Sequence, residues 1–535
     1  MARKRHFLFI LPLIVFLCSI GGGIYGPRIP VASAASAAVA DSSELPVSKD
    51  LDEFTKVYAL IEQNAAEKLN PDKAIYRGAI PGMLRTLDPH SNFFDPKDYQ
   101  AILEEQKGTY FGVGMSVSPR NGKTVIIAPF PGAPAYKAGL RPGDIIISVN
   151  DKSTEGLNTT EVADLLKGPR GTPVKIVVSR EGAPDNVVYN VVRDEISRKS
   201  VPDATWVRPG IAYIKILQFG ENTARELDEN LKRLGENNIK GLVLDLRDNP
   251  GGLLNAGVSV ADHFLQRGQL IVSHHGRSSP ERTYVARNGN HGRDYPIVVL
   301  VNRNSASAAE IVTGAMQDHD RAWVLGETTF GKGLVQTVFP LSDRTALALT
   351  TAHFYTPSGR LIQRDYSNKS FYDYYFHRDE NARNDMDVKM TDSGRRVYGG
   401  GGITPDEKYD AAKMDHLEAD LYRSQLFNFT REYFAHHNSN LPKAWMPDET
   451  IINDLHDFLL KKNVTFTEKE FTADHDWIRR YLAKEVYLYA FNVDESDRMF
   501  AETDPEVARA IDAMPKAEAL VTNARKMVVQ RLQQR

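Results

Sequence analysis

Cysteine is almost absent from the sequence: among 535 residues there is only Cys18, which lies in the N-terminal apolar stretch. If that stretch is removed, the mature chain can form no disulfide bond, cysteine nucleophile or thiolate metal site. An excess of one charge sign is also missing, since 66 basic and 69 acidic residues give a formal net charge of −3. No strong field therefore favours nucleic acid or an anionic membrane surface as a partner.

The N-terminal residues have the features of an export signal. Three basic residues at positions 3–5 precede an apolar run over residues 7–20, and small residues follow around Ala34. We predict a signal peptide over residues 1–34. Because the apolar run continues to Tyr25, it is nearly long enough to serve as an uncleaved membrane anchor instead.

The remaining chain is long enough for several domains. Helical apolar spacing over residues 45–107 predicts a small helical domain, and short β-like runs separated by Gly and Pro over residues 108–185 predict a β-rich module. Residues 186–410 repeat strand, loop and helix, which indicates an α/β core. Residues 411–535 have helical spacing and no recognised motif, so we expect a helical extension that packs on the core or makes a dimer contact.

Two further features receive no function from the sequence alone. His90 lies beside a proline in the turn over residues 88–92, where a histidine is usually exposed or caps a helix. The aromatic cluster over residues 371–376 is expected to pack locally.

The β-rich module carries a candidate peptide-binding loop. Gly112, Val113, Gly114 and Met115 open an extended run, and backbone N–H groups at such glycines can approach a terminal carboxylate closely. Residues 133–150, APAYKAGLRPGDIIISVN, resemble the signature of PDZ domains. This resemblance implies that a peptide tail adds as a strand beside residues 114–117, with its carboxylate on the amides of Val113 and Gly114. The alternative is an ordinary hairpin turn.

The first informative α/β unit contains a glycine turn. Residues 241–246 form an apolar strand, residues 247–252 a sharp turn, and residues 253–264 a helix. Amides at Gly251 and Gly252 could stabilise an oxyanion, since the start of the helix adds partial positive charge. A plain strand-to-helix turn remains the competing interpretation.

The second unit places Ser307 at the mouth of a helix. The strand over residues 296–301 leads through a loop to a helix over residues 306–317. The positive end of that helix and the unpaired amide of Ala308 suit a nucleophile. However, Ser307 and Glu310 also have the spacing of a capping box, in which the serine has only a structural role.

A lysine downstream favours the chemical interpretation. Lys332 lies between two glycines and before an apolar run, which predicts a tight, dry environment rather than a solvated surface charge. In an extended run, Gln336 projects from the same face. A serine needs a base, and a lysine can act as one only where desolvation lowers its pKa.

Together these motifs resemble the C-terminal processing peptidases, or tail-specific proteases. The resemblance covers residues 51–406 and includes LDLRDNPGG (244–252), NSASAAE (304–310), TFGKGLVQ (329–336) and GGGITPD (400–406). It implies a crotonase-like α/β core with a PDZ domain covering its entrance. By this resemblance, Ser307 is the nucleophile, Lys332 the general base and Gln336 the residue that orients the lysine. The oxyanion hole would consist of the amide of Ala308 and that of Gly251 or Gly252.

The resemblance implies an exported serine endopeptidase in the periplasm or cell envelope of a bacterium. Its partners would be protein substrates with unstructured C-terminal tails and a second copy in a homodimer, and the chemistry requires no metal or organic cofactor. A noncatalytic PDZ scaffold that binds tails is the main alternative. A trypsin-like site is disfavoured because no Gly-Asn-Ser-Gly-Gly-like turn occurs, and none of the 14 histidines forms a His-Glu-x-x-His motif.

Overall fold

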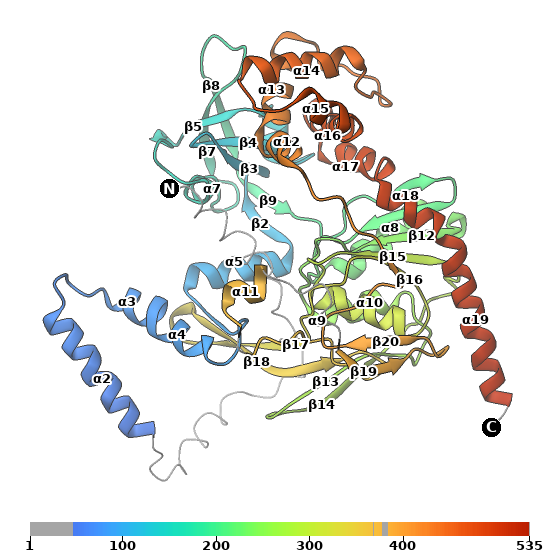
Figure 1. Ribbon diagram of the computed structural model, residues 1–535. Coiled ribbons are helices and arrows are strands. Elements are labelled where there is room, and N and C mark those ends of the chain that lie inside the picture. Colours follow the sequence, from blue (N-terminus) through green and yellow to red (C-terminus); the bar gives the residue numbers. More distant parts are fainter. Residues whose placement is uncertain (1–46, 368, 377–383, 534–535) are drawn as a thin grey trace.

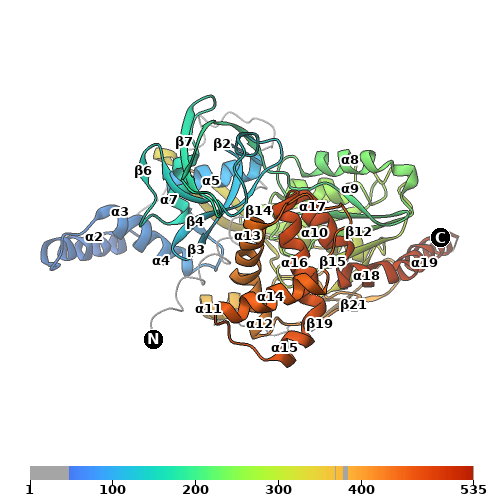
Figure 2. The same cartoon turned by 90° about the horizontal axis from the view of Figure 1, so that it is seen from above.

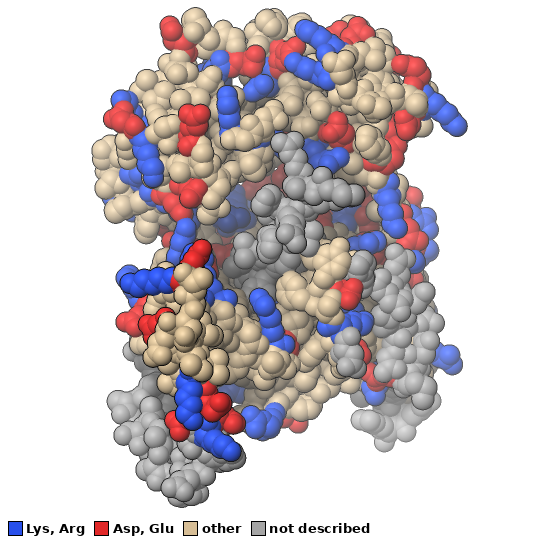
Figure 3. All heavy atoms as spheres, turned by 60° about the vertical axis from the view of Figure 1, so that its left-hand side comes forward, with Lys and Arg blue, Asp and Glu red and all other residues tan. Residues whose placement is uncertain are grey.

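The computed structural model describes residues 47–367, 369–376 and 384–533 (Figure 1). The predicted signal peptide or anchor over residues 1–34 lies outside them. Within the described ranges, no helix is both long and apolar enough to span a membrane. The face drawn in Figure 3 carries interspersed acidic and basic side chains, in agreement with the balanced composition.

The N-terminal region is mainly helical, and one short strand, β1, joins it to a sheet of the core. Its elements are α2 (Val47–Asn64), α3 (Pro71–Ala74), the π-helix η2 (Ile75–Ala79), α4 (Ile80–Arg85), β1 (Asn92–Phe94) and α5 (Pro96–Lys107). Strand β1 pairs antiparallel with β18 (Ala346–Tyr355), in a register that places Phe93 opposite Leu347. This pairing fixes the turn before β1 against the core sheet.

The next module is a six-stranded antiparallel sheet with two short helices, and its strand order is β3-β4-β5-β7-β8 with β6 paired to β5. Apolar side chains that alternate along the strands form its own core, including Ile126, Ile146 and Ile176. Strand β2 pairs with β9 outside this sheet and joins the module to the rest of the chain. The elements are β2 (Thr109–Gly112), β3 (Met115–Arg120), β4 (Lys123–Pro129), α6 (Pro134–Ala138), β5 (Ile145–Val149), β6 (Lys152–Ser153), α7 (Thr159–Leu166), β7 (Pro173–Ser179), β8 (Val187–Val192) and β9 (Asp194–Ser197).

The core contains two sheets with helices packed between them. One sheet has the order β10-β11-β12-β15-β16-β21 and is parallel from β11 onward, with helices between its strands as expected for the predicted α/β core. The other contains β1, β18, β13, β14 and β17. Side chains from α8, α9 and α10 join the two sheets in one apolar cluster that includes Leu231, Val260 and Val312.

The core consists of strands and helices over residues 205–408. They are β10 (Thr205–Arg208), β11 (Ile211–Lys215), α8 (Thr223–Leu234), η3 (Glu236–Asn238), β12 (Gly241–Asp245), α9 (Leu254–Asp262), β13 (Leu270–Gly276), β14 (Ser279–Val285), β15 (Ile297–Val301), α10 (Ala308–Asp318), β16 (Trp323–Gly326), β17 (Leu334–Pro340), η4 (Ser342–Arg344), β18, α11 (Phe371–Phe376), β19 (Asn384–Met390), β20 (Arg396–Gly399) and β21 (Glu407–Lys408). Strands β12 and β15 are buried along their whole length, which explains their uninterrupted apolar sequences.

The C-terminal region is helical and packs on two neighbours. Its helices are α12 (His416–Asp420), η5 (Leu421–Gln425), α13 (Leu426–His436), α14 (Glu449–Lys461), α15 (Glu468–Ala473), α16 (His475–Ala490), α17 (Val493–Glu502), α18 (Pro505–Asp512) and α19 (Met514–Gln533). Helix α13 lies beside the antiparallel module in Figures 1 and 2, and its Arg431 pairs with Glu181 at 3.3 Å. Helices α18 and α19 bury Val507 and Ala517 against the parallel sheet, on the face opposite α9 and α10. The predicted fold class, an α/β core with helical ends and a separate β module, is confirmed.

Candidate active site

Ser307 lies directly before α10, after the loop that leaves β15. Its backbone has a φ of 55°, in the left-handed region that residues with a side chain rarely adopt. Such strain costs about 1–3 kcal/mol and is concentrated at functional sites. Only 7% of the residue is exposed, so its hydroxyl group lies in a place largely shielded from bulk water.

The carboxylate of Glu310 connects the Ser307 and Lys332 segments. Oε2 accepts hydrogen bonds from the backbone N–H of Ser307 at 2.9 Å and from that of Lys332 at 2.8 Å. Oε1 accepts bonds from the Thr329 hydroxyl at 2.5 Å and the Gly331 N–H at 2.7 Å. Burial raises the pKa of Glu310, and these hydrogen bonds oppose that rise. The capping box is present, but its acid also fixes the lysine segment, so the structural and chemical interpretations do not exclude each other.

Lys332 is completely buried, as its glycine-flanked sequence predicted. A Cβ at Gly333 would lie 2.9 Å from the backbone nitrogen of Gln363, and one at Gly331 would lie 3.0 Å from that of Gly402. A real Cβ atom essentially never makes a contact under 3.0 Å, and Gly331 also has a φ of 86°, which residues with a side chain rarely adopt. Both neighbours of the lysine must therefore be glycine, because other chain segments close over it.

Gln336 links the lysine to the N-terminal region. The Nζ atom of Lys332 donates a hydrogen bond to Gln336 Oε1 at 3.3 Å, in agreement with the predicted common face. The other end of the same amide, Nε2, donates to the backbone carbonyl of His90 at 2.6 Å. The expectation that His90 is exposed or caps a helix is wrong, since the residue is only 1% exposed.

The glycine turn after β12 lies directly against the serine. A Cβ at Gly251 would come within 2.7 Å of Ser307 Cβ and 3.0 Å of the Ala308 nitrogen, and a Cβ at Gly252 would clash with Phe219 O at 2.2 Å. The turn itself uses the Gly251 amide, which donates to Asn249 Oδ1 at 2.8 Å. The structure thus brings the two predicted α/β units together.

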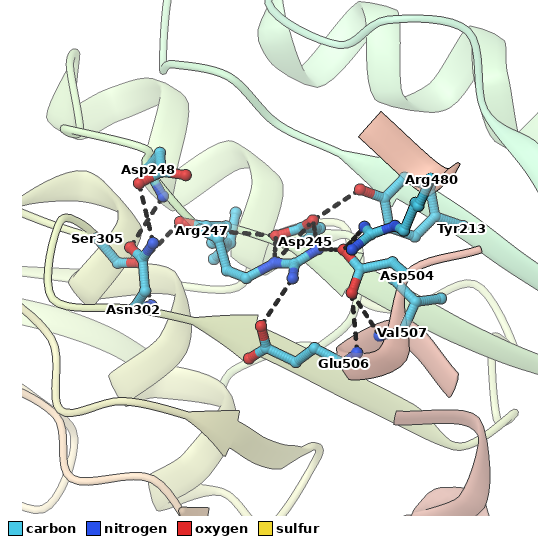
Figure 4. Close-up of polar contacts among 11 residues, drawn as sticks. Tyr213, Asp245, Arg247, Asp248, Asn302, Ser305, Arg480, Asp504, Glu506 and Val507 are labelled. Carbon is cyan, nitrogen blue, oxygen red and sulfur yellow. Dashed lines mark hydrogen bonds and ion pairs between the residues drawn. The ribbon is translucent and has the colours of Figure 1, made fainter. Parts of the chain in front are cut away.

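Hydrogen bonds between Asp248 and Asn302 connect this turn to the loop before Ser307 (Figure 4). The Asp248 N–H donates to Asn302 Oδ1, and Asn302 Nδ2 donates back to Asp248 Oδ1, both at 2.9 Å. The Asn302 N–H in turn donates to Ser305 Oγ at 2.9 Å. Because the pair is reciprocal, the two turns cannot shift independently.

One residue earlier, Arg247 connects the turn to the C-terminal helices (Figure 4). Its guanidinium contacts Asp245 at 2.6 Å, Glu506 at 2.7 Å and Asp504 at 3.0 Å. Burial opposes ionisation of Asp245, but the charge of Arg247 keeps the pKa of this carboxyl below its usual value. For Glu506, burial outweighs the same guanidinium and raises the pKa to about 7. We call this group of four residues the Arg247 cluster.

The antiparallel module has an open groove beside its edge strand β3. Strand β3 is at the end of its sheet, with β4 as its only neighbour in that sheet. A cavity of about 490 Å³ runs along it, lined by Val113, Gly114 and Met115 and, on the α7 side, by Ala163 and Leu166. Three of the four predicted loop residues thus line the groove, whereas the fourth, Gly112, ends β2, where it pairs with Asp194.

Sequence reasoning missed the roles of Glu310 and His90 in this site. Glu310 was considered only as a helix cap, although its spacing from the serine was visible. His90 approaches Gln336 across 246 positions of sequence, and no local pattern indicates such a contact. The aromatic cluster of α11 packs on the same histidine through Tyr374 and Tyr375.

Comparisons with known proteins agree with these features. Residues 210–367 match the family model of Peptidase family S41, and residues 125–180 match that of the PDZ domain. The chain is 39% identical over 296 residues to the carboxy-terminal-processing protease of Bartonella bacilliformis, covering 55% of this chain and 68% of that protein. It is 32% identical over 354 residues to carboxy-terminal processing protease CtpB of Bacillus subtilis, covering 64% of this chain and 73% of that protein.

Among solved structures, the photosystem II D1 C-terminal processing protease is 29% identical, with 68% of this chain and 88% of that chain covered and a TM-score of 0.35. The antiparallel module is a PDZ domain, and the α/β core is an S41 peptidase domain. From the identity and coverage of its relatives, the chain belongs to the carboxy-terminal processing proteases, which are serine proteases of family S41.

Proposed function

We propose that this protease is an exported endopeptidase that holds the C-terminal tails of protein substrates in its PDZ groove and cleaves them with Ser307 and Lys332. The observation that carries this proposal is the Glu310 carboxylate, whose Oε2 atom binds the backbone N–H of both residues at 2.9 and 2.8 Å. A serine with a strained backbone and a fully buried lysine are thereby held by one side chain. This arrangement suits a nucleophile and its base.

In the proposed mechanism, neutral Lys332 accepts the proton of Ser307 as Oγ attacks the substrate carbonyl carbon. Gln336 Oε1 orients the amine through its hydrogen bond. The oxyanion is held by two backbone N–H groups, those of Ala308 and Gly252. We assign Gly252 rather than Gly251 because the Gly251 amide already donates to Asn249.

The tetrahedral intermediate then collapses to an acyl-enzyme. Lys332 returns its proton to the departing amine, and it next takes a proton from water, which attacks the ester. The resulting acid is released as Ser307 regains its proton. The chemistry uses only groups of this chain and water.

The geometry of the PDZ groove supports tail binding by strand addition. Strand β3 is an edge strand of its sheet, and Val113 and Gly114, which directly precede it, line the groove. An apolar last side chain would fit beside Leu166, which is 5% exposed and belongs to the core of the domain.

The test is cleavage of a folded reporter that carries an unstructured C-terminal tail. Ser307→Ala and Lys332→Ala should each reduce turnover by at least about 10³-fold, whereas anisotropy should show unchanged binding of the labelled tail peptide. Ser342→Ala and Lys123→Ala, both at exposed positions, serve as matched controls. Turnover retained in the Ser307 or Lys332 variant would refute the mechanism, and tail binding without cleavage by the wild type would favour a noncatalytic scaffold.

Two further parts of the proposal concern the location and assembly of the enzyme. The residues at positions 1–34 act as an export signal that delivers the enzyme to the periplasm or cell envelope; mass spectrometry of the enzyme purified from cells would show the mature N-terminus. The enzyme forms a homodimer, which light scattering would reveal as twice the mass of one chain.

A further inference from the structure

We propose that His90, in the N-terminal helical region, is a positioning residue of the active site. Its backbone carbonyl fixes the orientation of the Gln336 amide, so that Oε1 faces Lys332. The rings of Tyr374 and Tyr375 hold His90 in place. This inference rests on the proposed Ser–Lys mechanism and adds the N-terminal region and α11 to the machinery.

The two ends of the Gln336 amide have different partners. Gln336 Nε2 donates to His90 O at 2.6 Å, while Gln336 Oε1 accepts from Lys332 Nζ at 3.3 Å. A primary amide can flip by 180°, and its orientation follows from its hydrogen-bond partners. A carbonyl oxygen accepts only, so His90 O requires the NH₂ end of Gln336. The oxygen end is then left for the lysine.

The backbone that carries the His90 carbonyl is itself held by hydrogen bonds. The Asp88 carboxylate accepts hydrogen bonds from the N–H of His90 at 2.7 Å and of Ser91 at 2.8 Å. Ser91 Oγ donates to the same carboxylate at 2.6 Å and accepts from Thr350 N, in β18, at 3.1 Å. The turn over residues 88–91 is thus closed on itself and joined to the core, next to the β1–β18 pairing.

Both nitrogens of the His90 imidazole ring make hydrogen bonds to tyrosines of α11. Tyr374 Oη accepts from Gln363 Nε2 at 3.2 Å, which leaves its own proton for His90 Nε2 at 3.0 Å. His90 Nδ1–H then donates to Tyr375 Oη at 3.1 Å, and the Tyr375 proton goes to Pro89 O at 3.3 Å. When the imidazole ring is neutral, each donor in this series of hydrogen bonds has one acceptor.

The electrostatic surroundings agree with a neutral ring. Burial lowers the pKa of His90 well below its usual value, and Lys332, when it is protonated, and Arg364 lower it further. The histidine and the proposed base lie near each other, because both contact the amide of Gln336. Phe330 and the two tyrosines pack edge-on or tilted around this ring and around each other, which excludes water from the same place.

The central test is His90→Phe, which keeps an aromatic ring but removes both ring nitrogens. We expect kcat on the tail-bearing reporter to fall by about 10–10²-fold, because displacing a catalytic group by about 1 Å can cost that much. KM for the tail should stay unchanged, since the PDZ groove is not altered. Tyr372→Phe is the matched control, because this tyrosine is on α11 but 45% exposed, and it should behave as wild type.

A double-mutant cycle separates positioning from a general structural role. If His90 acts through Gln336, the double variant His90→Phe, Gln336→Ala should lose no more kcat than Gln336→Ala alone. Multiplicative losses, or an unchanged kcat in His90→Phe, would overturn the proposal. Should His90→Phe fail to fold, Tyr374→Phe with Tyr375→Phe removes the two anchoring hydroxyls and must give the same non-additive result.

Lys332→Ala is measured in parallel so that the two proposals can fail separately. If Lys332→Ala is inactive while His90→Phe has wild-type kcat, the Ser–Lys mechanism stands and the positioning role is refuted. If Lys332→Ala retains turnover, the mechanism itself is refuted, whatever the histidine variant does.

Discussion

Replacing Glu506 by glutamine should remove a pH dependence of stability that the wild-type enzyme owes to the Arg247 cluster. Burial raises the pKa of this carboxyl from 4.5 to about 7, although Arg247 contacts it at 2.7 Å. A carboxyl group that binds its proton more tightly in the folded than in the unfolded state stabilises the fold fully below pH 4.5. That stabilisation is lost as the pH rises through about 7, where the folded protein releases the proton.

The magnitude follows from these two values. The difference between 7 and 4.5 corresponds to about 3 kcal/mol in total. Of this, about 2 kcal/mol falls between pH 5.5 and pH 8.5. Glutamine carries no proton to release, and its Oε1 can still accept from Arg247, so Glu506→Gln should lack this contribution.

Urea denaturation followed by tryptophan fluorescence at pH 5.5 and 8.5 measures the difference. The stability of the wild type should fall by about 2 kcal/mol more than that of Glu506→Gln over this interval. Glu502→Gln is the control, because Glu502 lies on the neighbouring helix α17 and pairs with Arg498. Equal pH dependence in the wild type and Glu506→Gln would refute the reasoning.

Three other substitutions test the remaining parts of the site. Glu310→Gln turns an NH₂ group toward N–H donors and leaves about two of them unsatisfied at about 1–3 kcal/mol each; kcat should fall by about 10²-fold, and wild-type kcat would contradict the shared-carboxylate argument. Gly333→Ala places a Cβ 2.9 Å from the Gln363 nitrogen, so thermal unfolding should occur earlier and activity should be lost; an active, equally stable variant would be contrary to the crowding described. Ala163→Glu puts a negative charge in the groove and should raise KM for the tail substrate at least tenfold with kcat unchanged; a steady KM would place the tail elsewhere.

The sequence predicted the elements whose pattern is local. The apolar runs of the buried strands β12 and β15, each followed by a turn and a helix, predicted α/β units. The glycines on either side of Lys332 predicted that this lysine is buried. The relation between Lys332 and Gln336 also follows from their spacing on one extended run.

The sequence could not predict contacts that join distant segments. His90 meets Tyr374 across 284 positions, and Arg247 meets Glu506 across 259. Neither pairing has a periodic signal, because each depends on how whole elements pack. The residues involved are polar and buried, and propensity alone assigns such residues to the surface.

Both ends of the described chain are needed to complete the fold of the catalytic core. Strand β1 pairs with β18 near its beginning, and α18 and α19 cover the outer face of the parallel sheet at its end. Without α18 and α19, the apolar side chains on that face, such as Val243 and Leu300, would be open to water. A variant that lacks these two helices should therefore aggregate rather than fold into a shorter protease.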